Sequence, residues 1–157
     1  MNKTMNKLLI ALLLTLTSTA TFAGKEEDQQ IKFRQSAYSV LGWSTARIKA
    51  QVVDRPETFN KEEVQAAANL VAAIANSGLG KLYGLGTDEG TGWKKTRLKP
   101  EFFQKPDEAK KVAVAFNQEA NELAKVAATG DAGAIRVQFT KVSESCKACH
   151  DSFRIRE

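Results

Sequence analysis

Apolar residues recur at intervals of three, four and seven positions in four separate segments, which is the spacing of one face of an α-helix. The positions on these four stripes are Ile31, Arg34, Tyr38, Leu41, Ile48 and Val52; Val64, Ala67, Val71 and Ile74; Val112, Phe116, Ala120, Leu123 and Ala127; and Ile135, Phe139, Val142, Cys146, Cys149 and Phe153. No appreciable stretch alternates as a β-strand does. Because no helix can bury such a stripe alone, the pattern predicts an all-α, antiparallel four-helix bundle.

Residues that favour helix ends bound the four segments. The first helix is expected over Glu26–Val53, before Pro56, because a proline disfavours helix in the residue that precedes it. The second is expected to start at the N-cap residue Asn60, with Glu63 at the N3 position of a capping-box-like pair. The other expected boundaries are Gly78 after the second helix, Pro106 and Gly130 for the third, and Asp131 as the N-cap of the fourth.

The connection between the second and third helices, residues 78–105, is much longer than the others. It contains six glycines, with Tyr83, Trp93, Phe102 and Phe103 between and after them. A loop of this length is normally functional or partly structured. Its aromatic residues indicate that it packs down onto the bundle and covers a cofactor.

The N-terminus has the three parts of a secretory signal peptide. Lys3 and Lys7 precede an uninterrupted apolar run over Leu8–Leu14, and small residues follow up to Ala23. The run is too short to span a bilayer, which needs about 20 apolar residues, although a retained anchor or a disordered start are alternatives. We expect residues 1–23 to be removed, with cleavage after Ala20 as the other option. The mature domain would then be residues 24–157, exported and without a stable membrane anchor.

The charge of the chain gives no reason to expect a nucleic-acid partner. The formal charge of +5 falls by two to +3 without Lys3 and Lys7. No run of five or six like charges is present. The sequence lacks the basic patch that nucleic-acid binding requires.

Cys146, Cys149 and His150 are the only two cysteines and the only histidine of the chain, and they form the motif C-x-x-C-H. This motif is the covalent attachment site of c-type haem: both thiols add to haem vinyl groups and the imidazole binds the iron. On a helix the three residues fall at i, i+3 and i+4 and therefore share one face. The motif predicts one covalently attached haem c, with His150 as the axial iron ligand.

Other chemistries for two neighbouring cysteines fit less well. Outside the cytosol a nearby pair commonly forms a disulfide, but the adjacent histidine favours haem. A structural zinc ion takes four Cys or His ligands, whereas this chain has three in all. A thioredoxin-like pair opens a helix after a strand in a βα pattern, and here the pair lies in a helical stretch near the C-terminus.

The composition restricts the sixth position on the iron. The only methionines are Met1 and Met5, so removal of the signal leaves neither a Met nor a second His. Electron-transfer cytochromes normally use Met or His there. Lysine and tyrosine remain alternatives, although a charged lysine would need to be deprotonated and buried. We therefore expect five-coordinate iron with an apolar or aromatic open face, which binds small diatomic gases.

Three groups of residues together resemble a known family. They are the C-terminal C-x-x-C-H with Asp151 and Phe153-Arg154 after it, Phe-Arg-Gln-Ser-Ala at 33–37, and Tyr-Gly-x-Gly-Thr at 83–87. These residues resemble cytochrome c′, the high-spin class II c-type cytochromes. The resemblance spans the mature chain and implies an up-down-up-down four-helix bundle with haem packed between the helices.

The resemblance implies roles around the haem edge. Arg34 and Gln35 would lie by the haem propionates; the alternative for Arg34 is a solvated charge. Thr91 or a neighbour would contact the haem edge. Arg154, one helical turn beyond His150, would shield the proximal ligand or approach a propionate, or would be an exposed cation favoured by the helix dipole.

The resemblance also implies which residues cover the open iron face. Tyr38 falls at the covering position, with Leu41 one turn later, and Tyr83 would complete this wall. The hydroxyl of Tyr38 would hydrogen-bond a ligand or a water; the alternative is an aromatic core residue whose hydroxyl reaches solvent.

These observations support two functions. The first is a periplasmic protein that binds or scavenges gases, with nitric oxide preferred and carbon monoxide binding the ferrous form. The second is an electron carrier between periplasmic redox partners. A peroxidase is a weaker alternative, because peroxide cleavage needs a distal acid–base group and no second His exists. We expect no enzymatic activity. The resemblance also implies a homodimer packed through the first two helices, with the exposed side around Trp43 contributing.

Overall fold

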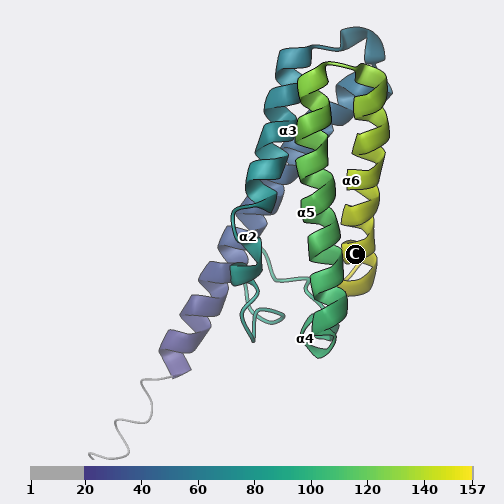
Figure 1. Ribbon diagram of the computed structural model, residues 1–157. Helices are drawn as coiled ribbons and strands as arrows, with labels where there is room; N and C mark the ends of the chain where they lie inside the picture. Colours follow the sequence, from purple (N-terminus) through teal and green to yellow (C-terminus); the bar gives the residue numbers. More distant parts are fainter. Residues whose placement is uncertain (1–19, 157) are drawn as a thin grey trace, which may run out of the picture.

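The computed structural model describes residues 20–156, with side chains from residue 24 onward (Figure 1). Four long helices form an up-down-up-down bundle, as the sequence predicts. They are α2 (Ala20–Lys49), α3 (Lys61–Ala75), α5 (Pro106–Thr129) and α6 (Ala132–Phe153). Over the described part of the chain, β-structure is limited to two isolated bridges. None of the described helices is long and apolar enough to cross a membrane.

Helix α2 is longer than the sequence predicts at its N-terminal end, and its last turn differs. It begins at Ala20, and residues 50–54 form the π-helix η1 (Ala50–Asp54). The 3-10 turn η2 (Pro56–Thr58) follows. Most of the predicted signal peptide, residues 1–19, lies outside the described residues. The proposed junction at Ala23 falls inside α2, so cleavage there stays a prediction.

The N-terminus of α3 is capped by Asn60, as predicted, but the second half of the expected capping box is wrong. The Asn60 side chain accepts a hydrogen bond from the Glu63 amide at 2.9 Å. The Asn60 amide does not use the Glu63 carboxylate; it donates instead to Oε1 of Gln51 at 2.8 Å. Gln51 Nε2 donates in turn to Glu63 at 2.8 Å. A side chain from the π-helix η1 therefore ties the two helices together at this end.

The other predicted helix boundaries agree with the structure. Gly130, with a φ of +79°, is the left-handed C-cap of α5. Helix α3 ends with Asn76 as its C-cap, and Gly78, two residues later, has a φ of +82° and precedes η3. Asp131 caps α6 by accepting a hydrogen bond from the Ala134 amide at 3.0 Å. The long connection is partly structured: it contains the 3-10 helix η3 (Leu79–Leu82) and the short helix α4 (Glu101–Gln104).

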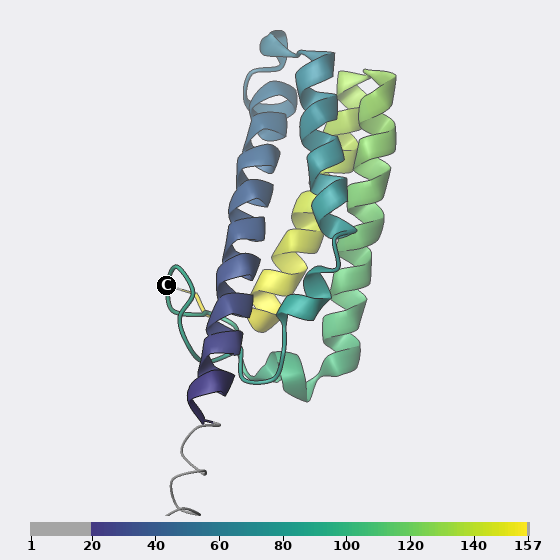
Figure 2. The ribbon, with the colours of Figure 1, turned by 90° about the vertical axis from the view of Figure 1, so that its left-hand side faces the viewer.

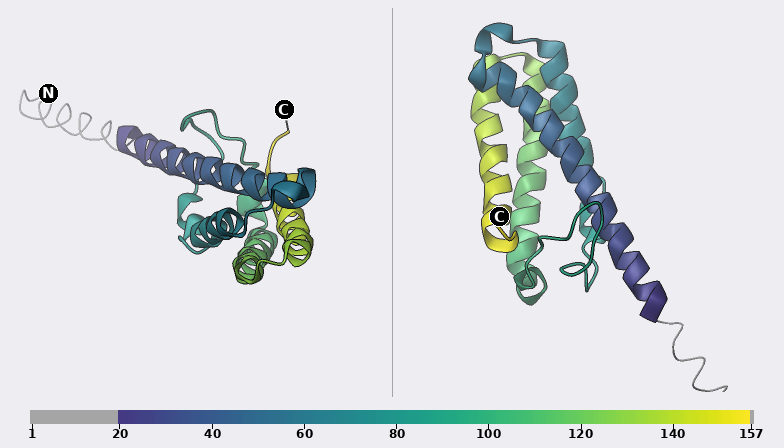
Figure 3. Two further views of the ribbon diagram at one scale, coloured as in Figure 1. Left: turned by 90° about the horizontal axis from the view of Figure 1, so that it is seen from above. Right: turned by 180° about the vertical axis from the view of Figure 1, so that it is seen from behind.

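The bundle is tightly packed at one end and more open at the other. At the end that holds η1 and the turn between α5 and α6, the apolar side chains are almost fully buried. They include Val52, Val64, Val71, Leu123, Ala127 and Ile135. Toward the other end, Val112, Phe116, Cys146 and Cys149 are only half-buried. Helix α2 packs on α3 and scarcely contacts α6, and it leans away from the other three toward its N-terminal end (Figures 1 and 3).

Candidate functional site

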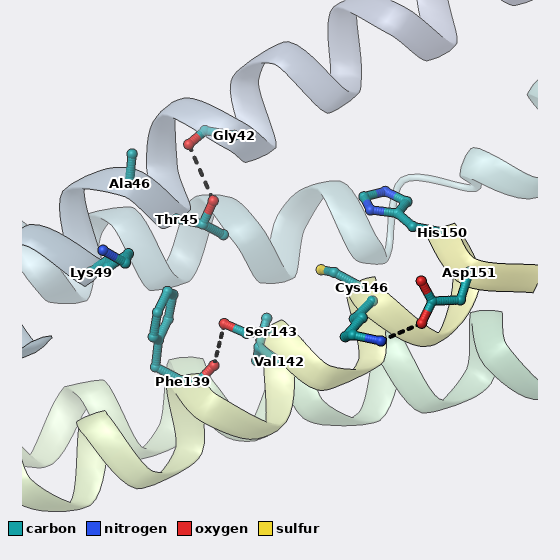
Figure 4. Close-up of a pocket in the computed structure, with 11 residues that line it drawn as sticks. Gly42, Thr45, Ala46, Lys49, Phe139, Val142, Ser143, Cys146, His150 and Asp151 are labelled. Atoms are coloured by element: carbon teal, nitrogen blue, oxygen red, sulfur yellow. Dashed lines mark hydrogen bonds and ion pairs between the residues drawn. The ribbon is translucent and has the colours of Figure 1, made fainter. Parts of the chain in front are cut away.

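The last three turns of α6 carry the Cys-x-x-Cys-His motif. Cys146 and Cys149 are half-buried free thiols, while His150 is exposed. Cys146 and His150 project from α6 into the space below α2 (Figure 4). The helix therefore presents two thiols and an imidazole from consecutive turns, as the spacing predicts.

A cavity of about 540 Å³ lies between α2 and α6, beside this motif (Figure 4). Its size falls in the range of about 300–1,000 Å³ typical of small-molecule and cofactor sites. Helix α2 contributes Gly42, Thr45, Ala46 and Lys49, and α6 contributes Phe139, Val142, Ser143, Cys146, Lys147, His150 and Asp151. The two lysines that line it are each held by a carboxylate, Lys49 by Asp54 and Lys147 by Asp151.

The protonation of the motif suits covalent attachment and metal binding. Burial raises the pKa of the Cys146 and Cys149 thiols, so both stay protonated at neutral pH. Burial lowers the pKa of His150, although the neighbouring Asp151 raises it and Arg97 lowers it further. The neutral imidazole has a nitrogen lone pair for a metal ion.

Tyr38 of α2 meets Tyr83, which follows η3, near the thiols. The two hydroxyl oxygens are 2.7 Å apart and share a hydrogen bond. Burial raises the pKa of both phenols, and the neighbouring Cys149 raises it further. The residue Tyr38 is nevertheless 39% exposed.

Tyr83 continues into a row of aromatic rings that crosses to α6. Its ring stacks on Phe102 of α4, with centroids 4.7 Å apart. Phe102 makes an edge contact with Phe153 of α6, with centroids 5.4 Å apart. The expected packing of the loop aromatics onto the bundle is therefore found for Tyr83 and Phe102.

Arg34 and Gln35 hold the long loop against α2. Arg34 is only 5% exposed, so the alternative of a solvated charge is wrong. It donates to the Leu82 carbonyl, to both the hydroxyl and the carbonyl of Thr87, and to the Thr96 hydroxyl, at 2.9–3.1 Å. Gln35 exchanges hydrogen bonds with the backbone of Trp93 and Lys94. Contact of Arg34 and Gln35 with haem propionates stays a prediction.

The remaining predicted residues lie at different depths. Leu41 is 6% exposed and belongs to the core, one turn from Tyr38. Thr91 is exposed, and its amide bonds to Asp28, which lies ten residues, or about 15 Å of helix, before Tyr38. The structure therefore does not bring Thr91 to the thiols.

Arg154 is not on the helical face where the spacing places it. Helix α6 ends at Phe153, and Arg154 is the extended C-cap residue. It forms an isolated bridge with Leu98 of the loop. The expectation that the helix continues through Arg154 is wrong, because the loop pairs with the backbone there and ends the helix.

The residues of this region fit a covalently attached haem. Two adjacent reduced thiols, a neutral imidazole and an apolar-walled cavity are the donors and the surroundings that haem c requires. The motif at 83–87 includes Thr87, but the sequence did not indicate that Thr87 and Thr96 are buried partners of Arg34, nor that Phe102 contacts Phe153. Their only signal was a polar or aromatic residue in a glycine-rich loop.

Comparison with known proteins gives one consistent result. The sequence model of the family described as cytochrome C′ matches residues 29–154. A cytochrome c′ of Rhodocyclus tenuis is 56% identical over 133 residues, covering 85% of this chain and 98% of that protein. A solved cytochrome c′, described as having an unusual ligand-controlled dimer dissociation, is 47% identical with a TM-score of 0.77. The alignment covers 83% of this chain and 97% of that one.

A further solved structure is a nitric oxide complex of a variant cytochrome c prime from Alcaligenes xylosoxidans. It is 25% identical with a TM-score of 0.73, and the alignment covers 83% of this chain and 97% of that chain. Both solved structures have the bundle seen here.

Proposed function

Because this chain belongs to the cytochrome c′ family, we propose that it is a periplasmic protein that binds nitric oxide, and also carbon monoxide, at an open iron face. The family carries covalently attached haem c, and when bound that haem supplies the iron on which a gas is held. In this chain Cys146 and Cys149 would hold the haem and His150 would bind the iron. The nitric oxide complex of the relative from Alcaligenes xylosoxidans supports the choice of gas.

The observation that supports the proposal most directly is that the polar groups near the thiols already have partners or are used by the motif. The chain has one histidine, which the motif uses, and its two methionines lie in the predicted signal peptide. The phenols of Tyr38 and Tyr83 are held by each other and stay protonated, since burial raises the pKa of each. Lys49 and Lys147, which line the cavity, are paired with carboxylates. These groups are poor candidates for a sixth iron ligand.

Absorption spectra of the purified ferric and ferrous protein, with and without nitric oxide, test this function. We expect high-spin spectra that change when nitric oxide is added. A sharp low-spin α-band in the ferrous protein, or no response to nitric oxide, would overturn the proposal. Either result would favour an electron carrier between periplasmic redox partners.

We also propose that the protein is a binding protein rather than an enzyme, and that it is a homodimer. No second histidine is available as the acid–base group that peroxide cleavage needs. The outer face of α2 exposes Phe33, Val40 and Trp43, with exposed fractions of 58%, 39% and 56%. The ligand-controlled dimer dissociation of the solved relative supports the proposal of a dimer.

A further inference from the structure

Tyr83 is restrained from three sides. Its ring stacks on Phe102 with an interplanar angle of 21°. The guanidinium of Arg34 lies 4.5 Å from the centroid of the Tyr83 ring, in a cation–π contact. Its hydroxyl is bonded to Tyr38 at 2.7 Å. Because Tyr83 lies in a loop, its side chain could otherwise move. These three contacts hold it in place.

The partners of Tyr83 are themselves fixed. Phe102 makes edge contacts with Phe103 and Phe153, at centroid distances of 5.5 and 5.4 Å. Arg34 is held by its four hydrogen bonds to the loop. Tyr83 is therefore anchored to α4 and α6 through rings and to α2 through a buried cation.

Tyr38 has much less support. The residue is 39% exposed, and the hydrogen bond between its hydroxyl and that of Tyr83 restrains the phenol end. A tyrosine side chain turns about two angles, so a fixed partner at its hydroxyl decides where the ring lies. Tyr83 is therefore the fixed member of the pair, and Tyr38 is the member whose side chain can rotate.

We propose that Tyr83 is a positioning residue that holds the Tyr38 ring beside the thiols, so that an entering gas must break the Tyr38–Tyr83 hydrogen bond. This inference rests on the proposed function and on Tyr38 covering the iron face. One of the two tyrosine hydroxyls donates its proton to the Tyr38–Tyr83 hydrogen bond, and the other hydroxyl can donate its proton to a different acceptor. The loop that carries Tyr83 thereby determines how readily a gas reaches the iron face.

Two single variants and their combination test the inference in the holoprotein. Tyr83→Phe keeps the ring on Phe102 and removes the hydroxyl, while Tyr38→Phe removes the same bond from the other side. We expect each to speed carbon monoxide association with the ferrous protein by about three- to tenfold, the effect of one hydrogen bond. Because both delete one bond, the double variant should match either single variant. A double effect equal to the product of the single effects would overturn the inference.

Ser36→Ala is the matched control. It removes the 2.8 Å hydrogen bond from Trp93 Nε1 to Ser36, which joins the same loop to the same helix without touching Tyr38. We expect its association rate to stay within about twofold of that of the unmodified protein, since Tyr38 keeps its partner. An increase equal to that of Tyr83→Phe would show that loosening the loop is sufficient, and would overturn the role of the hydroxyl.

A measurement without gas tests the hydrogen bond itself. Tyr38 and Tyr83 are the only two tyrosines of the chain, so the tyrosine bands of Tyr83→Phe in ultraviolet resonance Raman report Tyr38 alone. We expect the Tyr38 bands of the ferric holoprotein to shift toward those of a solvated phenol. Unshifted bands would overturn the inference. Failure of the unmodified protein to bind either gas would overturn the proposed function, whereas normal binding with an unchanged rate in Tyr83→Phe would overturn only the positioning role.

Discussion

Arg34 is a cation that the fold buries by giving its guanidinium four acceptors in the long loop. A lysine at this position has its three donors on one nitrogen and cannot reproduce the planar fork of the guanidinium. We expect Arg34→Lys to destabilise the protein by about 2 kcal/mol, because several buried acceptors lose their donor. Urea unfolding followed by circular dichroism measures the change.

Arg47→Lys makes the same substitution on the same helix and is the control. Arg47 lies over the exposed Trp43 ring, 4.7 Å from its centroid, and a lysine can take that place. We expect a cost below about 0.5 kcal/mol. Equal costs at the two positions would show that the loop contacts of Arg34 contribute little to stability.

Tyr38 controls access through the volume of its ring as well as through its hydroxyl. Tyr38→Ala removes the ring, and we expect carbon monoxide to associate about 10- to 100-fold faster, a barrier lower by ~1.4–2.8 kcal/mol. Flash photolysis of the ferrous complex gives the rate. Val40→Ala, on the outer face of α2, should leave the rate unchanged. An unchanged rate in Tyr38→Ala would exclude a gating role for this residue.

The sequence predicts individual site residues well only where the chemistry is local. Cys146, Cys149 and His150 lie within five residues, so their motif carries the whole signal. The bond between Tyr38 and Tyr83 joins positions 45 apart, and that between Arg34 and Thr96 joins positions 62 apart. No periodic pattern encodes such pairs, because the path of a glycine-rich loop decides them.

Gly130 determines how α5 turns into α6. Its φ of +79° is unfavourable for residues with a Cβ, and an added Cβ would meet only the flexible Lys61 side chain. We therefore expect Gly130→Ala to cost about 1 kcal/mol, from the backbone conformation rather than from a clash. Gly130→Asn should cost less, since Asn tolerates this conformation. Thermal unfolding compares the two; equal melting temperatures would contradict this explanation.

The helices themselves could be predicted because their signals repeat along the chain. Ala120, Leu123 and Ala127 of one stripe are buried, as are Ile135, Phe139 and Val142 of the next. Asp131 caps the helix that begins between them. The π-helix at residues 50–54 could not be predicted, since the stripe continues through Val52 with helical spacing. Within it, Gln51 bonds Asn60 and Glu63 at the start of the next helix, a tertiary contact that the stripe does not encode.

At the scale of the molecule, the outer face of α2 is the surface on which the proposed dimer depends. Trp43→Glu places a charge on this face, and we expect it to raise the dimer dissociation constant at least about tenfold, as loss of an important interface aromatic does. Sedimentation velocity measures the change. Val137→Glu is the control, since Val137 is 62% exposed on α6. A dimer that survives Trp43→Glu but not Val137→Glu would move the interface to α6.

The uneven packing of the bundle predicts where the molecule depends on its cofactor. The end with Val52, Val64 and Ile135 is closed by protein alone, whereas a cavity lies between α2 and α6 beside Cys146. The loop in Figure 2 that crosses the N-terminal half of α2 is held mainly by polar contacts such as those of Arg34. A segment with few buried apolar contacts opens at lower free energy than the core.

The double variant Cys146→Ser/Cys149→Ser would prevent covalent attachment of haem. Each end of the bundle would then be held by its protein contacts alone. We expect amide hydrogen exchange to become at least about tenfold faster in residues 26–40 and 84–98, a loss of ~1.4 kcal/mol of local protection. Residues 64–72 and 135–142 should keep most of theirs, because their side chains form the buried apolar core, in which Cys146 is only a partly buried neighbour. Mass spectrometry of peptides from each region gives the comparison. Equal loss of protection at both ends would mean that the bundle unfolds as one unit and that the closed end depends on the cofactor as well.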